Sequence, residues 1–109
     1  MKKTNYLDKI PIRNAKISWT TENDIVILAV ENTGIFNRAF QLLLKKPKIS
    51  YIHLDKMGSF IWTLLDGEKS IFELGKLVEE KFGEEANPLY ERLVKYFEIL
   101  NSSKFICWK

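Results

Sequence analysis

The chain has 109 residues, 46% hydrophobic and 28% charged, a composition typical of one soluble globular domain. Cys107 is its only cysteine, which excludes an intramolecular disulfide, and no apolar run approaches the ~20 residues needed to cross a bilayer. The N-terminus lacks the apolar segment of a secretory signal, so we expect a cytoplasmic protein. The net charge of +3 is uneven, because residues 1–47 carry eight basic and four acidic side chains, whereas residues 48–109 carry nine and ten.

The first half of the chain predicts an arm followed by a β-hairpin. Residues 1–15 are polar, with scattered apolar positions, and precede what we interpret as a single domain over residues 16–109. Alternation from Lys16 to Thr20 and the apolar run within Asp24–Glu31 predict two antiparallel strands joined by a turn. The second strand is apolar on both faces, so we expect both faces to be covered. Apolar residues at helical spacing within Ile35–Lys45 predict an extra helix, which Pro47 would end.

A third strand is predicted immediately before the helical part of the chain, over Ile49–Leu54. One of its faces would carry Ile49, Tyr51 and His53, and the other Ser50, Ile52 and Leu54. A short terminal strand is expected at Phe105–Trp108. If that strand paired with the edge of Ile49–Leu54, the third strand would be an inner one.

Three amphipathic helices with recognisable ends follow the third strand. Asp55 is a candidate cap for the first, whose apolar stripe begins at Met57 and which Gly67 would stop. Trp62 lies beside that stripe, and we expect it in the core. Ser70 and Glu73 form a capping box for the second helix, which Gly83 would end. For the last helix, Asn87 is the expected cap, with Pro88 at the first helical position.

The order of these elements predicts an α+β fold. We expect a winged-helix-like domain in which a small antiparallel sheet of three strands packs on a three-helix bundle, with the extra helix between strands two and three. On the last helix the stripe runs through Leu89, Leu93, Phe97 and Leu100, and Tyr90 and Val94 widen it beyond what burial alone requires.

Residues able to carry catalysis or metal binding are sparse. His53 is the only histidine, and no ligand-like spacing of acidic or thiol side chains surrounds it, so we interpret it as a surface or half-buried residue. Cys107 lies among Phe105, Ile106 and Trp108, which favours a small core side chain. No catalytic group, cofactor or metal is expected.

The stretch after the third strand resembles a known family. Its residues read Leu54-Asp55-x-x-Gly58-Ser59-Phe60-Ile61-Trp62-x-x-Leu65-Asp66-Gly67, followed by Ser70-Ile71-x-Glu73-Leu74 and Phe82-Gly83. This ordered set is similar to pyrroloquinoline quinone synthesis protein D (PqqD-like) sequences, over about residues 16–108. The predicted helix within Gly34–Lys46 departs from the minimal family pattern.

The resemblance implies a peptide-binding, non-enzymatic protein of the kind called a RiPP recognition element. Such domains bind the leader segment of a ribosomally made precursor peptide and present it to a modifying enzyme, often a radical S-adenosylmethionine protein. The leader would add as a strand to Ile49–Leu54 and rest against the last helix, with Tyr90, Val94 and Phe97 as a wall. These three side chains are equally compatible with a core position.

Two other functions stay open from the sequence. A winged-helix order also suits nucleic-acid binding, but acidic residues balance or outnumber basic ones in the second and third predicted helices. A general protein interaction module is the other alternative.

Overall fold

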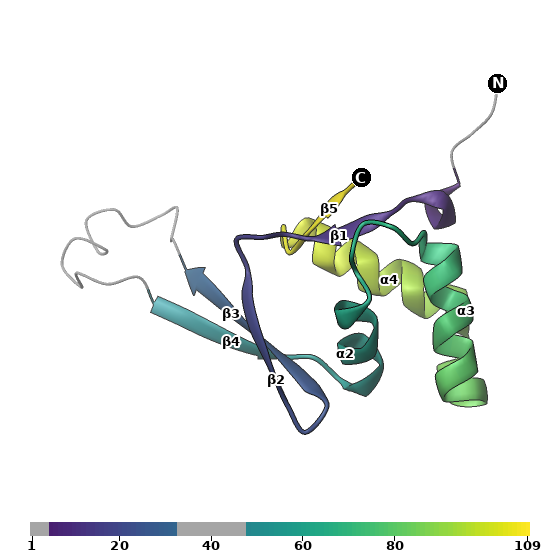
Figure 1. The fold of residues 1–109 in the computed structure, drawn as a ribbon, viewed down its shortest axis with the longest axis horizontal. Coiled ribbons are helices and arrows are strands. Elements are labelled where there is room, and N and C mark those ends of the chain that lie inside the picture. Colours follow the sequence, from purple (N-terminus) through teal and green to yellow (C-terminus); the bar gives the residue numbers. More distant parts are fainter. Residues whose placement is uncertain (1–4, 33–47) are drawn as a thin grey trace.

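The computed structural model describes residues 5–32 and 48–109, and it shows an α+β fold (Figure 1). In the described residues, three α-helices accompany an antiparallel sheet with the strand order β2-β3-β4, as the sequence predicted. The elements are η1 (Tyr6–Asp8), β1 (Pro11–Arg13), β2 (Ser18–Glu22), β3 (Ile25–Asn32), β4 (Lys48–His53), α2 (Lys56–Thr63), α3 (Ile71–Phe82), η2 (Gly83–Ala86), α4 (Leu89–Ser102) and β5 (Ile106–Trp108). The helix expected within Ile35–Lys45 lies outside the described residues.

The three-stranded sheet is built on a tight hairpin. Asn23 and Asp24 join β2 to β3 and have φ angles of 52° and 65°, the left-handed conformations typical of a two-residue hairpin turn. The register pairs Trp19 with Leu28, and Leu28 with Ile52. Since side chains alternate along a strand, these three lie on one face, which packs on α2.

Strands β1 and β5, one from each end of the described chain, pair to form a second, two-stranded sheet. The alternative in which Phe105–Trp108 pairs with the third strand and makes it an inner one is therefore wrong. Within the N-terminal arm, residues 5–15 are tied to the helices: the Ile71 N–H donates to the Lys9 carbonyl (2.9 Å), and the Arg13 guanidinium donates to the Trp62 carbonyl (2.9 Å).

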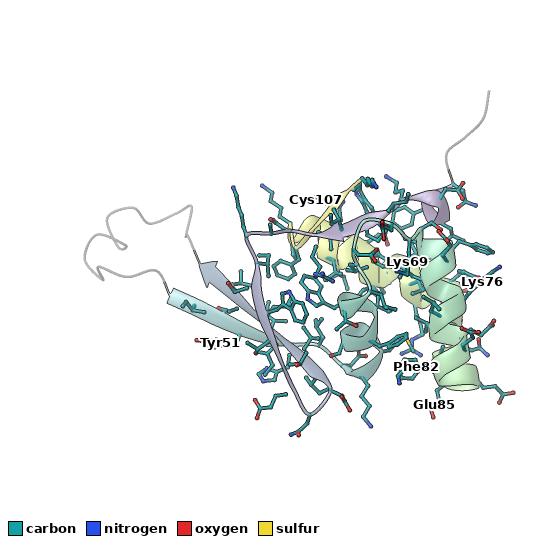
Figure 2. The ribbon with its side chains drawn as sticks, viewed as in Figure 1. Tyr51, Lys69, Lys76, Phe82, Glu85 and Cys107 are labelled. Carbon is teal, nitrogen blue, oxygen red and sulfur yellow. The ribbon has the colours of Figure 1, made fainter. Side chains whose placement is uncertain are left out.

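Cys107 is exposed, so its predicted core position is also wrong (Figure 2). Alternation along β5 turns Ile106 inward and Cys107 outward.

Most helix ends follow the predicted caps. The Asp55 carboxylate accepts from the Gly58 N–H, and Ser70 and Glu73 form the complete capping box. Gly83 ends α3 with a φ of 57°.

Two helix boundaries differ from the prediction. The last helix is preceded by Pro88 at the capping position without a side-chain cap, so Asn87 does not cap it. The first helix ends at Thr63, the N–H of its cap residue Leu64 donates to the Ile61 carbonyl, and Gly67 (φ 81°) belongs to the following turn.

The core lies between the sheet and the helices. Trp62 is fully buried, as predicted, and its ring meets Trp19 edge-to-face at 6.3 Å between centroids. The buried apolar residues are Val26, Leu28, Ile61, Trp62, Leu65, Ile71, Leu74, Val78, Ala86, Leu89, Leu93, Phe97, Leu100 and Ile106. None of the helices in residues 5–32 and 48–109 combines the length and apolar character required to cross a membrane.

Candidate functional site

Strand β4 forms one edge of the three-stranded sheet, and among the described residues no strand pairs with its outer side. The Leu54 N–H donates to the Val26 carbonyl (2.9 Å), which shows that the main chain of Leu54 points toward β3. In an antiparallel pair this direction alternates along the strand. The main-chain groups of Ile49, Tyr51 and His53 therefore point away from β3, toward the outer edge.

The side chains of β4 separate into an exposed and a half-buried set. Ile49 and Tyr51 are 45% and 65% exposed, and His53 is exposed on the same face, as its sequence environment predicted (Figure 2). Ser50, Ile52 and Leu54 are half-buried on the face that packs on the helices. The edge thus combines outward main-chain groups with accessible apolar surface.

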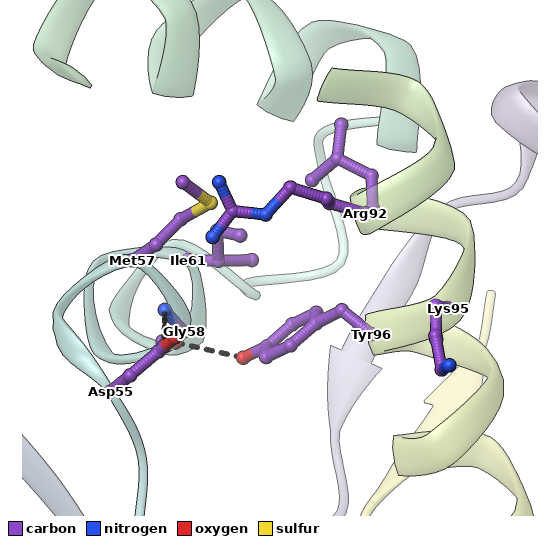
Figure 3. A pocket seen from close by; sticks show the side chains of 8 residues that line it. Asp55, Met57, Gly58, Ile61, Arg92, Lys95 and Tyr96 are labelled. Carbon is purple, nitrogen blue, oxygen red and sulfur yellow. Dashed lines mark hydrogen bonds between the residues drawn. The ribbon is translucent and has the colours of Figure 1, made fainter. Parts of the chain in front are cut away.

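A pocket of about 210 Å³ lies just past the C-terminal end of β4, between α2 and α4 (Figure 3). Met57, Ile61 and Leu93 give it an apolar lining. Asp55, Gly58, Arg92, Lys95 and Tyr96 complete it. Since Asp55 follows His53 by two residues, the pocket is close to one end of the β4 edge.

Two hydrogen bonds of the Gly58 main chain hold Tyr96 and Asp55 in place in the pocket. The Tyr96 hydroxyl donates to the Gly58 carbonyl (2.8 Å), and the Gly58 N–H donates to the Asp55 carboxylate (2.7 Å) (Figure 3). Burial raises the pKa of Tyr96, and the charge of Asp55 acts in the same direction, so the hydroxyl stays protonated as a donor.

The close approach of α2 and α4 depends on the absence of a side chain at Gly58. A Cβ atom there would lie 2.9 Å from Asp55 Oδ1 and 3.0 Å from Tyr96 Cε1, both shorter than ordinary contacts. A larger residue would therefore displace Tyr96 or the cap.

The lining of the pocket carries charges of both signs, the Asp55 carboxylate together with Arg92 and Lys95. Arg92 Nη1 donates to the Glu85 carbonyl (2.7 Å), which holds the guanidinium beside Met57 (Figure 3). Within residues 5–32 and 48–109 the only ion pair joins Lys69 and Asp66, so neither Arg92 nor Lys95 is paired with a carboxylate there. Asp55 is already engaged as the helix cap.

The structure does not bring Tyr90, Val94 and Phe97 together as one wall. Tyr90 and Val94 line a different hollow, with Tyr6 and Leu7, on the other flank of α4. Phe97 is 0% exposed and packs in the core, which corrects its assignment to a surface groove.

A sequence model of the family described as coenzyme PQQ synthesis protein D (PqqD) matches residues 24–106. The chain belongs to the PqqD family. The matched segment runs from the β2–β3 turn to β5 and so includes β4 and every residue of the pocket. No curated protein and no solved structure matches the chain.

Sequence reasoning missed Arg92, Lys95 and Tyr96 of this PqqD-family chain as site residues. Arg92 and Tyr96 flank the buried stripe of α4 on the side opposite Tyr90 and Val94, whereas Lys95 also lines the hollow that contains Tyr90 and Val94. A helical stripe identifies the buried face, but it does not tell which flank lies next to a given strand. The available signal was an aromatic residue, Tyr96, three positions after Leu93 and next to Phe97.

Proposed function

We propose that this PqqD-family protein is a non-enzymatic adaptor that binds the leader segment of a ribosomally made precursor peptide. The leader adds as a strand to β4, and the adaptor presents it to a modifying enzyme, which for such domains is often a radical S-adenosylmethionine protein. The observation that supports this proposal is the outer edge of β4, which no strand covers in the described residues. Strand addition uses such an edge for affinity and side-chain contacts for selectivity.

The free energies expected from such contacts favour a weak, reversible complex. Ile49, Tyr51 and His53 offer outward main-chain groups, and each hydrogen bond contributes only about 1 kcal/mol net. Burial of two or three leader side chains adds about 1.5–3 kcal/mol each. After the costs of association, we expect roughly micromolar affinity.

The α4 residues that we assign to the peptide-binding site differ from those expected from the sequence. The strand residues Ile49–Leu54 stay in the proposal. Arg92 and Tyr96 replace Tyr90, Val94 and Phe97, because they share a pocket with Asp55, which follows the strand. The wall is thus the α4 flank nearest the end of β4.

A proline at position 51 tests the main-chain contribution of the edge. Tyr51→Pro removes an outward N–H and leaves the hydrogen bonds to β3 in place, since Pro is tolerated on an edge strand when its missing N–H faces outward. The matched control, Tyr51→Ala, removes the side chain but keeps the N–H. Peptides selected on the wild-type protein from a displayed random library serve as ligands, in fluorescence anisotropy titrations.

We expect Tyr51→Pro to bind these peptides about fivefold or more weakly than Tyr51→Ala, corresponding to one lost hydrogen bond. Amide-shift mapping should place the bound peptide at residues 49–54. Equal affinities for the two variants, shifts confined to other surfaces, or the absence of any selected peptide would refute strand addition. Circular dichroism checks that both variants are folded.

A further inference from the structure

We propose that a second copy of this chain pairs with the outer edge of β2, so that the three-stranded sheets of the two copies join into one continuous sheet. The two β2 strands run antiparallel about a two-fold axis at Thr20. This proposal goes beyond peptide binding, because it uses the sheet edge opposite β4 and leaves both β4 edges free.

The outer side of β2 has main-chain groups without a hydrogen-bond partner. The Val26 carbonyl accepts from Leu54 and points toward β4, so alternation along β3 directs Ile27 toward its β2 partner Thr20. Trp19 and Thr21 therefore direct their N–H and C=O groups outward. Among the described residues none bonds to these groups, and no other element is drawn in front of β2 in Figure 1.

Only one antiparallel register lets a second β2 use both residues. It places Trp19 of each copy opposite Thr21 of the other, and each of these residues then donates and accepts one main-chain hydrogen bond. A shift toward the N-terminus would require the Ile17 N–H, which already donates to the Asn14 carbonyl (3.0 Å). A shift toward the C-terminus would require Asn23, whose φ of 52° is outside the strand conformation.

The side chains are complementary in this same register. Lys16 comes level with Asp24 of the second copy, and Ser18 lies opposite Glu22, whose carboxylate can accept from the Ser18 hydroxyl. These four residues are exposed, and in the part of the chain that the structure describes the three charged ones have no ion-pair partner. Each acidic residue of the edge would therefore gain a partner in the second copy.

The composition of β2 also leaves the edge open to pairing. Natural proteins often block an exposed edge with a lysine or a proline within the strand, and β2 (Ser18–Glu22) contains neither. Because the paired segment is short, the interface is small, and we expect a weak dimer with a Kd on the order of 0.1 mM.

Disulfide cross-linking of the full chain tests the residue at the axis. Thr20 of one copy would lie opposite Thr20 of the other in a pair without main-chain hydrogen bonds, where the Cα atoms are about 4.5 Å apart, a separation that a disulfide can span. Thr20→Cys is made in a Cys107→Ser background, because Cys107 is exposed. Ser18→Cys and Glu22→Cys in the same background are the matched controls, since each thiol would face a different residue.

In a glutathione redox buffer, we expect Thr20→Cys to form a covalent dimer about tenfold faster than either control. A mixture of the two controls should give the disulfide between positions 18 and 22 in preference to either homodimer. Equal rates at the three positions would overturn the proposal.

Sedimentation velocity of the Cys107→Ser protein measures the non-covalent dimer. Thr21→Pro removes an outward N–H from each copy, so it should weaken the dimer about tenfold relative to Thr21→Ala. Lys16→Glu should weaken it more than Lys95→Glu, the same charge change on an exposed residue of α4, and the difference should shrink at high salt.

Two results of this measurement would contradict pairing at β2. A protein that stays monomeric at about 1 mM would exclude the dimer. A dimer that Tyr51→Pro weakens and Thr21→Pro does not would place the contact at β4. The binding of a peptide to β4 is measured separately, so the failure of either proposal is distinguishable from the failure of the other.

Discussion

Replacing Gly58 by Ala should destabilise the protein, although the same change in an ordinary helix is stabilising. In an exposed helix interior, Gly→Ala gains about 0.5–1 kcal/mol. Here the new Cβ would lie 2.9 Å from Asp55 Oδ1 and 3.0 Å from Tyr96 Cε1. Loss of the cap costs about 1 kcal/mol, loss of the Tyr96 hydrogen bond about 1 kcal/mol, and overpacking about 1–3 kcal/mol. We therefore expect a net loss of about 2–4 kcal/mol in the free energy of unfolding.

Urea denaturation followed by circular dichroism measures this loss. The variant Asp55→Ala supplies the control, because it removes one of the two atoms that the Cβ would meet. Gly58→Ala should cost less in that background than in the wild type, since residues in contact are not additive. A Gly58→Ala protein as stable as the wild type, or more stable, would refute the assigned packing of α2 against α4.

Three further predictions concern other parts of the chain. Ser70→Ala should lower the free energy of unfolding by about 1 kcal/mol, because it breaks the capping box of α3; a urea midpoint equal to that of the wild type would contradict this. The pKa of Glu73 is lowered by the hydrogen bond from the Ser70 N–H, and that of Asp66 by the hydrogen bond from Lys69. Their stabilising contributions are therefore present above the unfolded-state pKa values near 4 and are lost as the pH falls through the folded-state values, so Glu73→Gln and Asp66→Asn should each flatten the acid side of a stability–pH curve. Finally, Cys107 should react with Ellman's reagent in the native protein, and reaction only after unfolding would show that it is buried.

Features set by neighbouring residues were predictable from the sequence. The caps at Asp55 and Ser70 and the end of α3 at Gly83 each depend on hydrogen bonds or backbone conformation within a few residues. The strands of the sheet and the burial of Trp62 followed from period and apolar character. Strand β4 was predicted in this way, whereas its place at the edge of the sheet was implied by the family resemblance alone.

Features set by contacts between distant segments were not predictable. The partner of β5 is β1, almost 100 residues earlier, and nothing in either three-residue strand specifies that pairing. The same long-range contact decides that Cys107 faces outward. Likewise, the choice between Tyr90 and Tyr96 as the site aromatic depends on which flank of α4 meets α2, and the stripe of α4 is compatible with both.

The close packing of α4 against its neighbouring helices suits the wall that we propose for a weakly bound guest peptide. A glycine on each neighbouring helix faces a tyrosine of α4: a Cβ at Gly58 of α2 would lie 3.0 Å from Tyr96, and one at Gly75 of α3 would lie 3.1 Å from Tyr90. The helix is therefore held on both flanks by close contacts, and Arg92 lies between the two tyrosines in sequence. A wall that is already ordered costs little entropy when a peptide binds. In the complex that we propose, strand addition would supply only about 1 kcal/mol for each hydrogen bond, so the ordering of α4 would limit the entropy that peptide binding costs.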